Sequence, residues 1–368
     1  MAINHRKKIL CIIGTRPEAI KMAPIIALLK KELWAKVCIV VTAQHREMLD
    51  QMLSTFHITP DVDLDIMTPD QTLPELTAKL IQQLSTVFEK EKPDCVLAQG
   101  DTSTVFVAAL LSYYAKIPFG HVEAGLRTSN LYYPFPEEAN RILAGHLAAF
   151  HFAPTETAKK SLLKENIPNN KIFVTGNTVI DSLLSITKKV KVEKNNLHQK
   201  LILVTAHRRE NFGENFLNIC RALKKIAKKF SDVQIIYPVH LNPNIQKIAH
   251  RELFKCDRIK LCEPLNYVEF VTLMKKCFCI LTDSGGIQEE APALKKPVLV
   301  LRNETERPEA VKAGVVKVIG LDPNKILLEV EKLFTNKAYY QRMAKGVSPY
   351  GDGKAAKRIV KILKNRLT

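Results

Sequence analysis

Short apolar runs alternate with longer amphipathic segments through most of the chain. In the first half, the runs predict strands at Ile9–Ile13, Val37–Val41, Cys95–Ala98, Phe119–Val122, Phe150–Ala153 and Ile172–Val174. In the second half, they predict strands at Leu201–Val204, Gln234–Tyr237, Ile259–Leu261, Cys279–Leu281 and Val298–Leu301. Strands that alternate with helix-length segments are typical of an α/β protein with parallel sheets.

The polar, lysine-rich segment Lys188–Lys200 separates the two sets of strands and is predicted to be a loop. A chain of 368 residues is long for one hydrophobic core and favours two domains. The sequence therefore predicts two doubly wound parallel-sheet domains that follow one another.

The segment Cys279–Pro292 is the most informative candidate for a binding site. Its apolar run ends in Thr-Asp-Ser-Gly-Gly, and a helix-like stretch follows. We expect Gly285 and Gly286 to permit a sharp turn and expose N–H groups, so that they bind a phosphate or diphosphate at the helix N-terminus. Glu290 lies one helical turn further on the same face, where its carboxylate can hold sugar hydroxyls. The structural alternative is a capped helix after a tight turn.

Other polar clusters directly follow the predicted strands. They are Gly14–Glu18, Thr42–Arg46, Gln99–Thr102, Glu123–Arg127, Thr205–Glu210, Pro238–His240 and Arg302–Arg307. Ligands of open parallel sheets bind at the carboxyl ends of the strands. Clusters in both halves therefore predict a site in the cleft between the two domains.

Composition narrows the class of protein. With 46% hydrophobic and 25% charged residues, the chain has the composition of a soluble globular protein. No apolar stretch reaches the ~20 residues of a membrane span, and no C-x-x-C pair or zinc-like spacing of His and Cys occurs. The first apolar run is too short for a signal peptide. We therefore expect a reduced, cytoplasmic, metal-free protein with no membrane partner.

The positive charge is concentrated in the second half. Residues 1–180 hold 19 Lys and Arg against 18 Asp and Glu, whereas residues 181–368 hold 36 against 19. Such an excess suits nucleic acid or an anionic surface. However, most of these lysines occur in pairs that are typical of solvated helix faces, and no nucleic-acid-binding motif is present. We predict no nucleic-acid partner.

Taken one by one, the polar candidates also have ordinary structural explanations as loop, cap, ion-pair or core residues. Glu137, Glu138 and Arg141, for example, have the spacing of a salt-bridged helix turn. The same holds for Arg16, Asp101, Glu123, His207, His240 and Phe270. Their positions at strand ends favour function only when they are considered together.

Several long motifs occur in a fixed order over essentially the whole chain. They are Gly14–Pro24, His121–Thr128, Pro136–Arg141, Thr175–Thr178, the His207 segment, Pro238–Pro243, Cys279–Pro292 and Thr305–Ala310. In these motifs the chain closely resembles the non-hydrolysing UDP-N-acetylglucosamine 2-epimerases. The resemblance implies two Rossmann-like domains of the GT-B type with the active site in the interdomain cleft. It implies domains at 1–175 plus 353–368, with a returning C-terminal helix, and at 176–352, which binds UDP.

The resemblance implies interconversion of UDP-N-acetylglucosamine and UDP-N-acetylmannosamine for cell-surface polysaccharide precursors, by a homodimer without cofactors. The C2 proton of the sugar is not next to a carbonyl group, so direct abstraction would leave an unstabilised carbanion. The family's route is anti elimination of UDP to 2-acetamidoglucal, followed by re-addition with inversion at C2. This route needs donors for the departing diphosphate and acid–base groups at the sugar. The turn at Gly14 lacks the G-x-G-x-x-G fingerprint of nicotinamide sites.

The resemblance also implies roles for individual residues. The catalytic candidates are Asp101, Glu123, Glu137 and His207, and the face of the sugar that each carboxylate serves stays open. The substrate-binding candidates are Arg16, Lys21, Arg141, Phe270, Ser284, Gly285, Gly286, Glu290 and Arg307. Among these, Ser284 and the two glycines hold the diphosphate, while Glu290 binds ribose and Phe270 lies near the uracil.

A second, regulatory substrate site in some members involves the positions of Gln44, His45, Arg208 and His240. Glu47 and Asp70 stand where such members carry a glutamine and an arginine, which weakens the expectation of anion capture there. Two alternative activities remain. One is a hydrolysing epimerase, which releases UDP and free N-acetylmannosamine, and the other is a GT-B glycosyltransferase.

Overall fold

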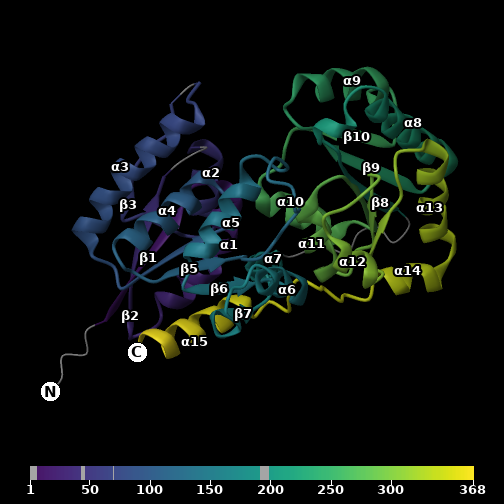
Figure 1. Ribbon diagram of the computed structural model, residues 1–368. Coiled ribbons are helices and arrows are strands. Elements are labelled where there is room, and N and C mark those ends of the chain that lie inside the picture. Colours follow the sequence, from purple (N-terminus) through teal and green to yellow (C-terminus); the bar gives the residue numbers. More distant parts are fainter. Residues whose placement is uncertain (1–5, 43–45, 69, 191–198) are drawn as a thin grey trace. The chain divides into compact units, whose positions relative to one another are not determined.

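The structure of the chain, a computed structural model, describes residues 6–42, 46–68, 70–190 and 199–368 and divides into two compact units. Unit 1 comprises Met1–Ser182 and Tyr350–Thr368, and unit 2 comprises Leu183–Pro349 (Figure 1). Each unit folds around a parallel sheet of its own.

The described part of unit 1 contains a seven-stranded parallel sheet in the order β3-β2-β1-β4-β5-β6-β7. The strands are β1 (Lys7–Ile13), β2 (Ala35–Val41), β3 (Val62–Asp63), β4 (Cys95–Gln99), β5 (Phe119–Val122), β6 (Phe150–Ala153) and β7 (Ile172–Val174). The helices are α1 (Arg16–Leu29), α2 (Arg46–Thr55), α3 (Leu73–Glu91), α4 (Ser103–Tyr114), α5 (Glu137–Leu147), α6 (Glu156–Lys164), the short 3₁₀ turn η1 (Asn169–Lys171), α7 (Thr178–Lys189) and α15 (Ala355–Leu367). Helix α7 starts in unit 1 and ends in unit 2.

Helices cover the central strands of unit 1 on both faces, which explains why these strands are apolar throughout. In β1, Leu10 and Ile12 belong to the core beneath α3, α4 and α5, whereas the alternate residues Ile9, Cys11 and Ile13 are buried on the opposite face. Helix α1 packs against β1 and β4, and α15 packs against α1. Strands that are buried on both faces form continuous hydrophobic runs rather than alternating ones.

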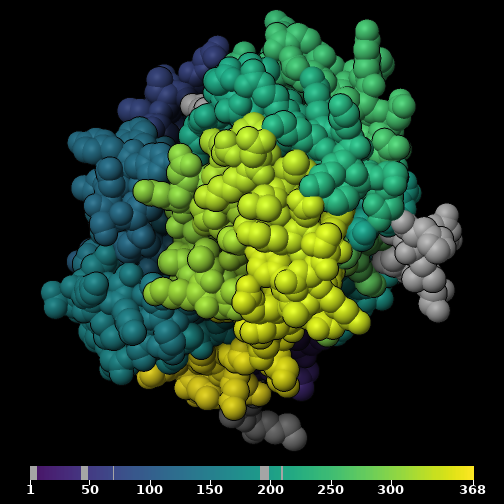
Figure 2. Space-filling view, turned by 90° about the vertical axis from the view of Figure 1, so that its right-hand side faces the viewer, coloured from purple at the N-terminus to yellow at the C-terminus, as the bar shows by residue number. Residues whose placement is uncertain are grey.

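The described part of unit 2 repeats the same winding with six parallel strands in the order β10-β9-β8-β11-β12-β13. The strands are β8 (Lys200–Thr205), β9 (Val233–Pro238), β10 (Ile259–Cys262), β11 (Cys279–Thr282), β12 (Val298–Val300) and β13 (Val316–Val318). The helices are the 3₁₀ turn η2 (Arg209–Asn211), α8 (Glu214–Lys229), α9 (Pro243–Leu253), α10 (Tyr267–Lys276), α11 (Gly285–Ala293), α12 (Pro308–Lys312), α13 (Pro323–Thr335) and α14 (Lys337–Met343). Helices α13 and α14 form a broad outer surface of this unit, coloured lime to yellow in Figure 2.

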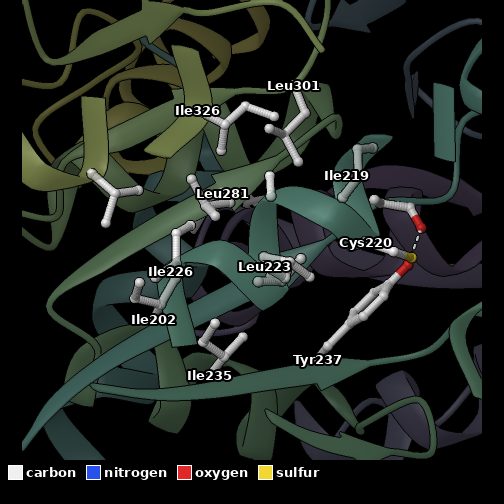
Figure 3. Close-up of a cluster of buried hydrophobic side chains, with 14 of the residues drawn as sticks. Ile202, Ile219, Cys220, Leu223, Ile226, Ile235, Tyr237, Leu281, Leu301 and Ile326 are labelled. Atoms are coloured by element: carbon white, nitrogen blue, oxygen red, sulfur yellow. Dashed lines mark hydrogen bonds between the residues drawn. The ribbon is translucent and has the colours of Figure 1, made fainter. Parts of the chain in front are cut away.

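The core of unit 2 lies between its sheet and helices α8, α9 and α13. Helix α8 contributes Ile219, Cys220, Leu223 and Ile226, which lie against Ile202, Ile235 and Tyr237 of the sheet (Figure 3). The buried hydroxyl of Tyr237 donates a hydrogen bond of 2.7 Å to the carbonyl oxygen of Ala206. This bond links the core to the loop that follows β8.

The predicted fold class is confirmed, because both sheets are parallel and helices alternate with strands in both units. Every predicted strand is present, although the last one ends one residue earlier than expected, at Val300. The short strands β3 and β13 were not predicted, because two or three residues give no readable periodicity. The expected loop Lys188–Lys200 begins as the last turn of α7 and ends as the first residue of β8, and residues 191–198 lie outside the described part.

Candidate functional site

The strand order places a switch point in each sheet, between β1 and β4 in unit 1 and between β8 and β11 in unit 2. At such a point the connections before and after it run to opposite sides, which leaves a crevice at the carboxyl ends of the strands. The polar clusters found in the sequence occupy the loops at these ends. Each unit therefore presents one candidate site.

In unit 2, the site is built on the N-terminus of α11. Gly285 and Gly286 are the first two helical residues, and neither has a positive φ. The expected sharp turn at the glycines is therefore wrong, and the glycines matter for the space that they leave. A Cβ atom on Gly285 would lie 3.7 Å from Nη2 of Arg307 and 3.8 Å from Nη2 of Arg208.

These contacts place two guanidinium groups beside a helix N-terminus that has no side-chain cap. Ser284 makes no capping hydrogen bond, and the first turn of α11 contains no acidic residue. The N–H groups and partial positive charge at such a terminus attract anions, and arginine binds phosphate through paired N–H donors. The arrangement in unit 2 is suited to a phosphate or diphosphate.

Buried carboxylates hold this anion site in place. Oδ2 of the fully buried Asp283 accepts hydrogen bonds from the backbone N–H groups of His207 and Arg208, both at 2.8 Å, and from Nδ2 of Asn211 at 2.9 Å. The buried carboxylate of Glu289 accepts a hydrogen bond from Nε of Arg307. The backbone at Arg208 and the guanidinium of Arg307 are thus held in place before any ligand binds, which lowers the ordering cost of binding.

Glu290 lies beside the same helix N-terminus, as its spacing from the glycines predicts. Its Oε1 would be 3.9 Å from a Cβ atom on Gly286. Its Oε2 accepts a hydrogen bond of 3.0 Å from the hydroxyl of Tyr267, a buried residue at the start of α10. Phe270 is partly buried, one turn further along α10. The carboxylate is therefore held in a fixed orientation next to the anion site.

Two histidines lie together in the loops after β8 and β9. The rings of His207 and His240 stack with centroids 5.4 Å apart and an interplanar angle of 18°. Burial lowers the pKa of His207, as do the neighbouring His240 and Arg208, whereas Asp283 opposes this shift. His207 is therefore held in its neutral form near neutral pH.

In unit 1, the site is a group of carboxylates with basic partners. Glu123 directly follows β5, has a left-handed φ of 66°, and is buried. Nζ of Lys21 donates to its two carboxylate oxygens at 2.8 and 2.6 Å, Nδ2 of Asn177 donates to Oε1 at 2.7 Å, and Nε2 of Gln99 donates to Oε2. Donors on three sides favour the ionised form of this carboxylate.

Asp101, in the loop after β4, has a different environment. Its Oδ2 lies 2.5 Å from Nη2 of Arg141, and its carbonyl oxygen accepts a hydrogen bond of 3.0 Å from Nδ2 of Asn140. Burial raises the pKa of Asp101, and the negative charges of Glu123 and Glu137 add to that rise, although Arg141 opposes it. Asp101 therefore binds a proton more readily than an exposed aspartate.

The remaining unit 1 candidates lie around this loop. Glu137 is the first residue of α5, and Arg141 lies one turn later. The negative charge of Glu137 raises the pKa of Asp101, and the positive charge of Arg141 lowers it. Arg16 is the first residue of α1 and directly follows the turn at Gly14. That turn requires glycine, because a Cβ atom there would lie 2.7 Å from Oγ1 of Thr104.

Some functional positions were not predicted as site residues. Asp283, Glu289 and Tyr267 hold the unit 2 ligand candidates, and Gln99 and Asn177 hold Glu123. All but Tyr267 belong to motifs already quoted from the sequence, so their position was visible but their partners were not. Tyr267 gave no signal.

Of the predicted regulatory residues, Gln44 and His45 lie outside the described residues. Arg208 and His240 lie in unit 2, where Arg208 faces Gly285 and His240 stacks on His207. In the part of the chain that the structure describes, no group of three or more His, Cys, Asp or Glu side chains is arranged to hold a metal ion. No described helix is long and apolar enough to cross a membrane.

Two parallel-sheet units, each with polar loops at its switch point, define an α/β protein of the two-Rossmann-domain GT-B type. A glycosyltransferase structure with 11% sequence identity shares this fold, with a TM-score of 0.67. The family model "UDP-N-acetylglucosamine 2-epimerase" matches residues 27–364, and the chain belongs to that family.

Individual relatives are similar to the chain over nearly its whole length. The UDP-N-acetylglucosamine 2-epimerase of Salmonella typhimurium is 52% identical, and the match covers 97% of this chain and 98% of that protein. The crystal structure of the Neisseria meningitidis enzyme bound to UDP-GlcNAc is 50% identical with a TM-score of 0.90, covering 97% of this chain and 100% of the other. A Methanocaldococcus jannaschii structure in complex with UDP-GlcNAc and UDP is 38% identical with a TM-score of 0.80, covering 97% and 99% of the two chains.

Proposed function

We propose that this chain interconverts UDP-N-acetylglucosamine and UDP-N-acetylmannosamine without releasing the sugar. The observation that carries the proposal is the pair of guanidinium groups beside Gly285, at an uncapped helix N-terminus. Such a site suits a diphosphate that must be held while it is detached from its sugar. Membership of the epimerase family and the similarity to a structure bound to UDP-GlcNAc support the same substrate.

Unit 2 binds the leaving group in this proposal. Arg208 and Arg307 stabilise the negative charge that develops on the diphosphate as the bond between C1 and the UDP oxygen breaks. Glu290, oriented by Tyr267, accepts hydrogen bonds from the ribose hydroxyls, and Phe270 lies near the uracil. His207, held neutral, donates a hydrogen bond to the diphosphate.

Unit 1 moves the proton at C2. Asp101 is the better proton carrier, since its raised pKa favours protonation, whereas Glu123 is surrounded by donors that keep it ionised. A carboxylate takes the C2 proton as UDP leaves, which forms the C1–C2 double bond of 2-acetamidoglucal. A proton is then delivered to the opposite face of C2 as UDP adds back at C1. We assign Asp101 to one face and Glu137 to the other.

The experiment that tests this function is incubation with UDP-N-acetylglucosamine in deuterated water. We expect deuterium at C2 of both epimers and a mixture of the two nucleotide sugars. Phosphorus NMR of the same reaction measures free UDP. Stoichiometric build-up of UDP would identify a hydrolysing epimerase instead, and consumption of the donor only after an acceptor is added would identify a glycosyltransferase.

We infer that the enzyme works in the cytoplasm as a homodimer and supplies a precursor for cell-surface polysaccharide. All eight cysteines, which lie in the described residues, are unpaired, as is usual in a reducing compartment. In unit 1, the large apolar side chains Tyr113, Tyr114 and Leu143 are 62%, 67% and 48% exposed on α4 and α5, which pack against each other. We infer that these exposed apolar side chains contact a second copy of the chain. Light scattering coupled to size exclusion tests the dimer, and a monomer at micromolar concentration would reject it.

A further inference from the structure

Gln288 is a fully buried side chain of α11 that the proposed mechanism leaves without a role. Its Nε2 donates a hydrogen bond of 3.2 Å to the backbone carbonyl oxygen of Ser284, the residue before the helix. Its Oε1 accepts a hydrogen bond of 2.5 Å from the hydroxyl of Thr305. Both ends of the buried amide are therefore bonded, and Gln288 joins the start of α11 to the loop after β12.

Thr305 extends this connection to Arg307. The oxygen of its hydroxyl accepts a hydrogen bond of 3.1 Å from the backbone N–H of Arg307. A hydroxyl group can accept one hydrogen bond while it donates another, so Thr305 accepts from Arg307 and donates to Gln288. The direction is fixed at the other end, because the carbonyl oxygen of Ser284 can only accept. Three hydrogen bonds therefore run in one direction, from the N–H of Arg307 to the carbonyl oxygen of Ser284.

Two neighbouring residues of α11 thus hold Arg307 at two points. Gln288 holds its backbone through Thr305, while the buried carboxylate of Glu289 accepts a hydrogen bond from its Nε. The Nη2 atom of the same arginine would lie 3.7 Å from a Cβ atom on Gly285, at the start of the helix. The helix N-terminus and the guanidinium group are therefore held next to each other by bonds that need no ligand.

Other helices of unit 2 begin in a different way. The side chains of Asn242, Asn266 and Asp322 cap α9, α10 and α13 by accepting hydrogen bonds from first-turn N–H groups. The residue before α11, Ser284, makes no such cap and is held through its carbonyl oxygen by Gln288. This bond does not use the first-turn N–H groups of α11, so it fixes the helix start without competing with an anion.

We propose that Gln288 and Thr305 are positioning residues for the diphosphate site, because they tie the backbone of Arg307 to the helix whose N-terminus forms that site. An arginine that is already held loses less conformational freedom when it binds phosphate. This inference rests on the proposed function for the identity of the ligand. The link between Thr305 and Arg307 is measurable without any ligand.

The first test compares two changes at Thr305, which lies in a loop and is partly exposed. Thr305→Val keeps the branched shape but removes both hydrogen bonds, whereas Thr305→Ser keeps the hydroxyl. We expect the Kd of UDP, measured by titration calorimetry, to rise at least fivefold in Thr305→Val and to stay within twofold in Thr305→Ser. Thr335→Val is the matched control, because its hydroxyl in unit 2 donates to the carbonyl oxygen of Glu331, and its Kd should match the wild type. Equal Kd values for the two Thr305 variants would overturn the proposal.

The second test asks whether the loss of affinity acts through Arg307. In protein that already carries Arg307→Ala, adding Thr305→Val should change the Kd of UDP less than twofold, because no guanidinium group is left to position. Gln288→Met has a similar length but no amide, so it should follow Thr305→Val in both backgrounds, and the Thr305 variants decide alone if this buried change prevents folding. A further fivefold loss from Thr305→Val in the Arg307→Ala background would show general damage to the site and contradict the proposal.

The third test needs no ligand and separates this inference from the proposed function. In protein labelled with ¹⁵N-arginine, the backbone amide signal of Arg307 is identified by its loss in Arg307→Ala, and its solvent exchange is measured by NMR. Exchange should be at least fivefold faster in Thr305→Val than in the wild type and unchanged in Thr305→Ser. Unchanged exchange in Thr305→Val would refute the link, even if the wild type binds UDP. The expected exchange in a wild type that does not bind UDP would establish the link and overturn the proposed ligand.

Discussion

The two switch points share one scaffold and carry opposite chemistry. In unit 1, the helix after the first strand has Glu18 in its first turn, whose carboxyl group accepts the N–H of Gly14. In unit 2, the helix at the switch point is α11, which follows β11. It begins with Gly285 and Gly286 and has no acidic residue in its first turn. A carboxyl group in the first turn of a helix partly neutralises the positive N-terminus, so that end of the helix attracts an external anion less strongly. A helix N-terminus without such a group keeps its partial positive charge and attracts an anion.

Each switch point also uses a buried carboxyl group to fix a loop, but the donors differ. Asp283 in unit 2 accepts three N–H groups through one oxygen. In unit 1, Glu18 accepts the N–H of Gly14, while burial raises the pKa of Asp101 and the negative charges of Glu123 and Glu137 raise it further. The comparison indicates that unit 2 is built to hold negative charge from a ligand, and unit 1 to hold and release a proton.

The largest expected effect separates these two tasks. Asp101→Asn keeps the shape of the side chain but removes the proton carrier, so we expect turnover to fall by about 10³-fold, within the range of general acid–base catalysis. The Kd of UDP, measured by titration calorimetry, should stay within twofold, because unit 2 is unchanged. Near-normal turnover would remove Asp101 from the mechanism, and a large loss of UDP affinity would break the division of labour.

The converse change lies in unit 2. Gly285→Ala adds a methyl group 3.7 Å from the Arg307 guanidinium, which is ordinary contact distance, so folding should be unaffected. The methyl group nevertheless occupies the space where a phosphate oxygen would meet both arginines. We expect the Kd of UDP to rise 30- to 100-fold, a loss of about 2–3 kcal/mol.

Thermal unfolding of Gly285→Ala provides the control, since alanine is a better helix former than glycine and the midpoint should not fall. Another glycine of unit 2, Gly213, is less suitable as a control position for this unfolding experiment. Its φ is 73°, so alanine there would strain the backbone. Unchanged UDP affinity in Gly285→Ala would show that the diphosphate binds elsewhere.

Acid should destabilise unit 1 through two buried histidines. His121 and His151 are register partners on β5 and β6, and burial lowers their pKa values to about 4 and about 3. Because the unfolded chain binds protons near pH 6.5 and the folded chain does not, the free energy of unfolding falls as the pH drops below about 6.5. Two such groups account for about 2 kcal/mol between pH 6.5 and 5.5.

Trp34, the one tryptophan of the chain, lies in unit 1 and reports its unfolding by fluorescence. Urea titrations at the two pH values measure the difference, and the double variant His121→Gln, His151→Gln should lose most of the pH dependence. A pH slope that is equally steep in the double variant would assign the effect to carboxylates instead.

The sequence predicted the winding of both units because buried parallel strands are continuous apolar runs, visible without partners. It also predicted Glu290 correctly relative to the glycines, since helical spacing fixes that geometry. The sequence did not predict features that depend on contacts between separate segments of the chain. The glycines leave room for Arg208 and Arg307, which come from loops far away along the chain, and no local pattern shows that.

The smallest expected effect tests how far the core of unit 2 supports its site. Tyr237 is fully buried, and its hydroxyl donates to the carbonyl oxygen of Ala206, the residue before His207 (Figure 3). Tyr237→Phe removes that bond and leaves a buried carbonyl without this donor, which should cost about 1 kcal/mol of unfolding free energy. Because Asp283 still holds the N–H groups of His207 and Arg208, UDP affinity should fall less than threefold. A larger loss, measured by the same calorimetric titration, would mean that the loop depends on the core hydrogen bond rather than on Asp283.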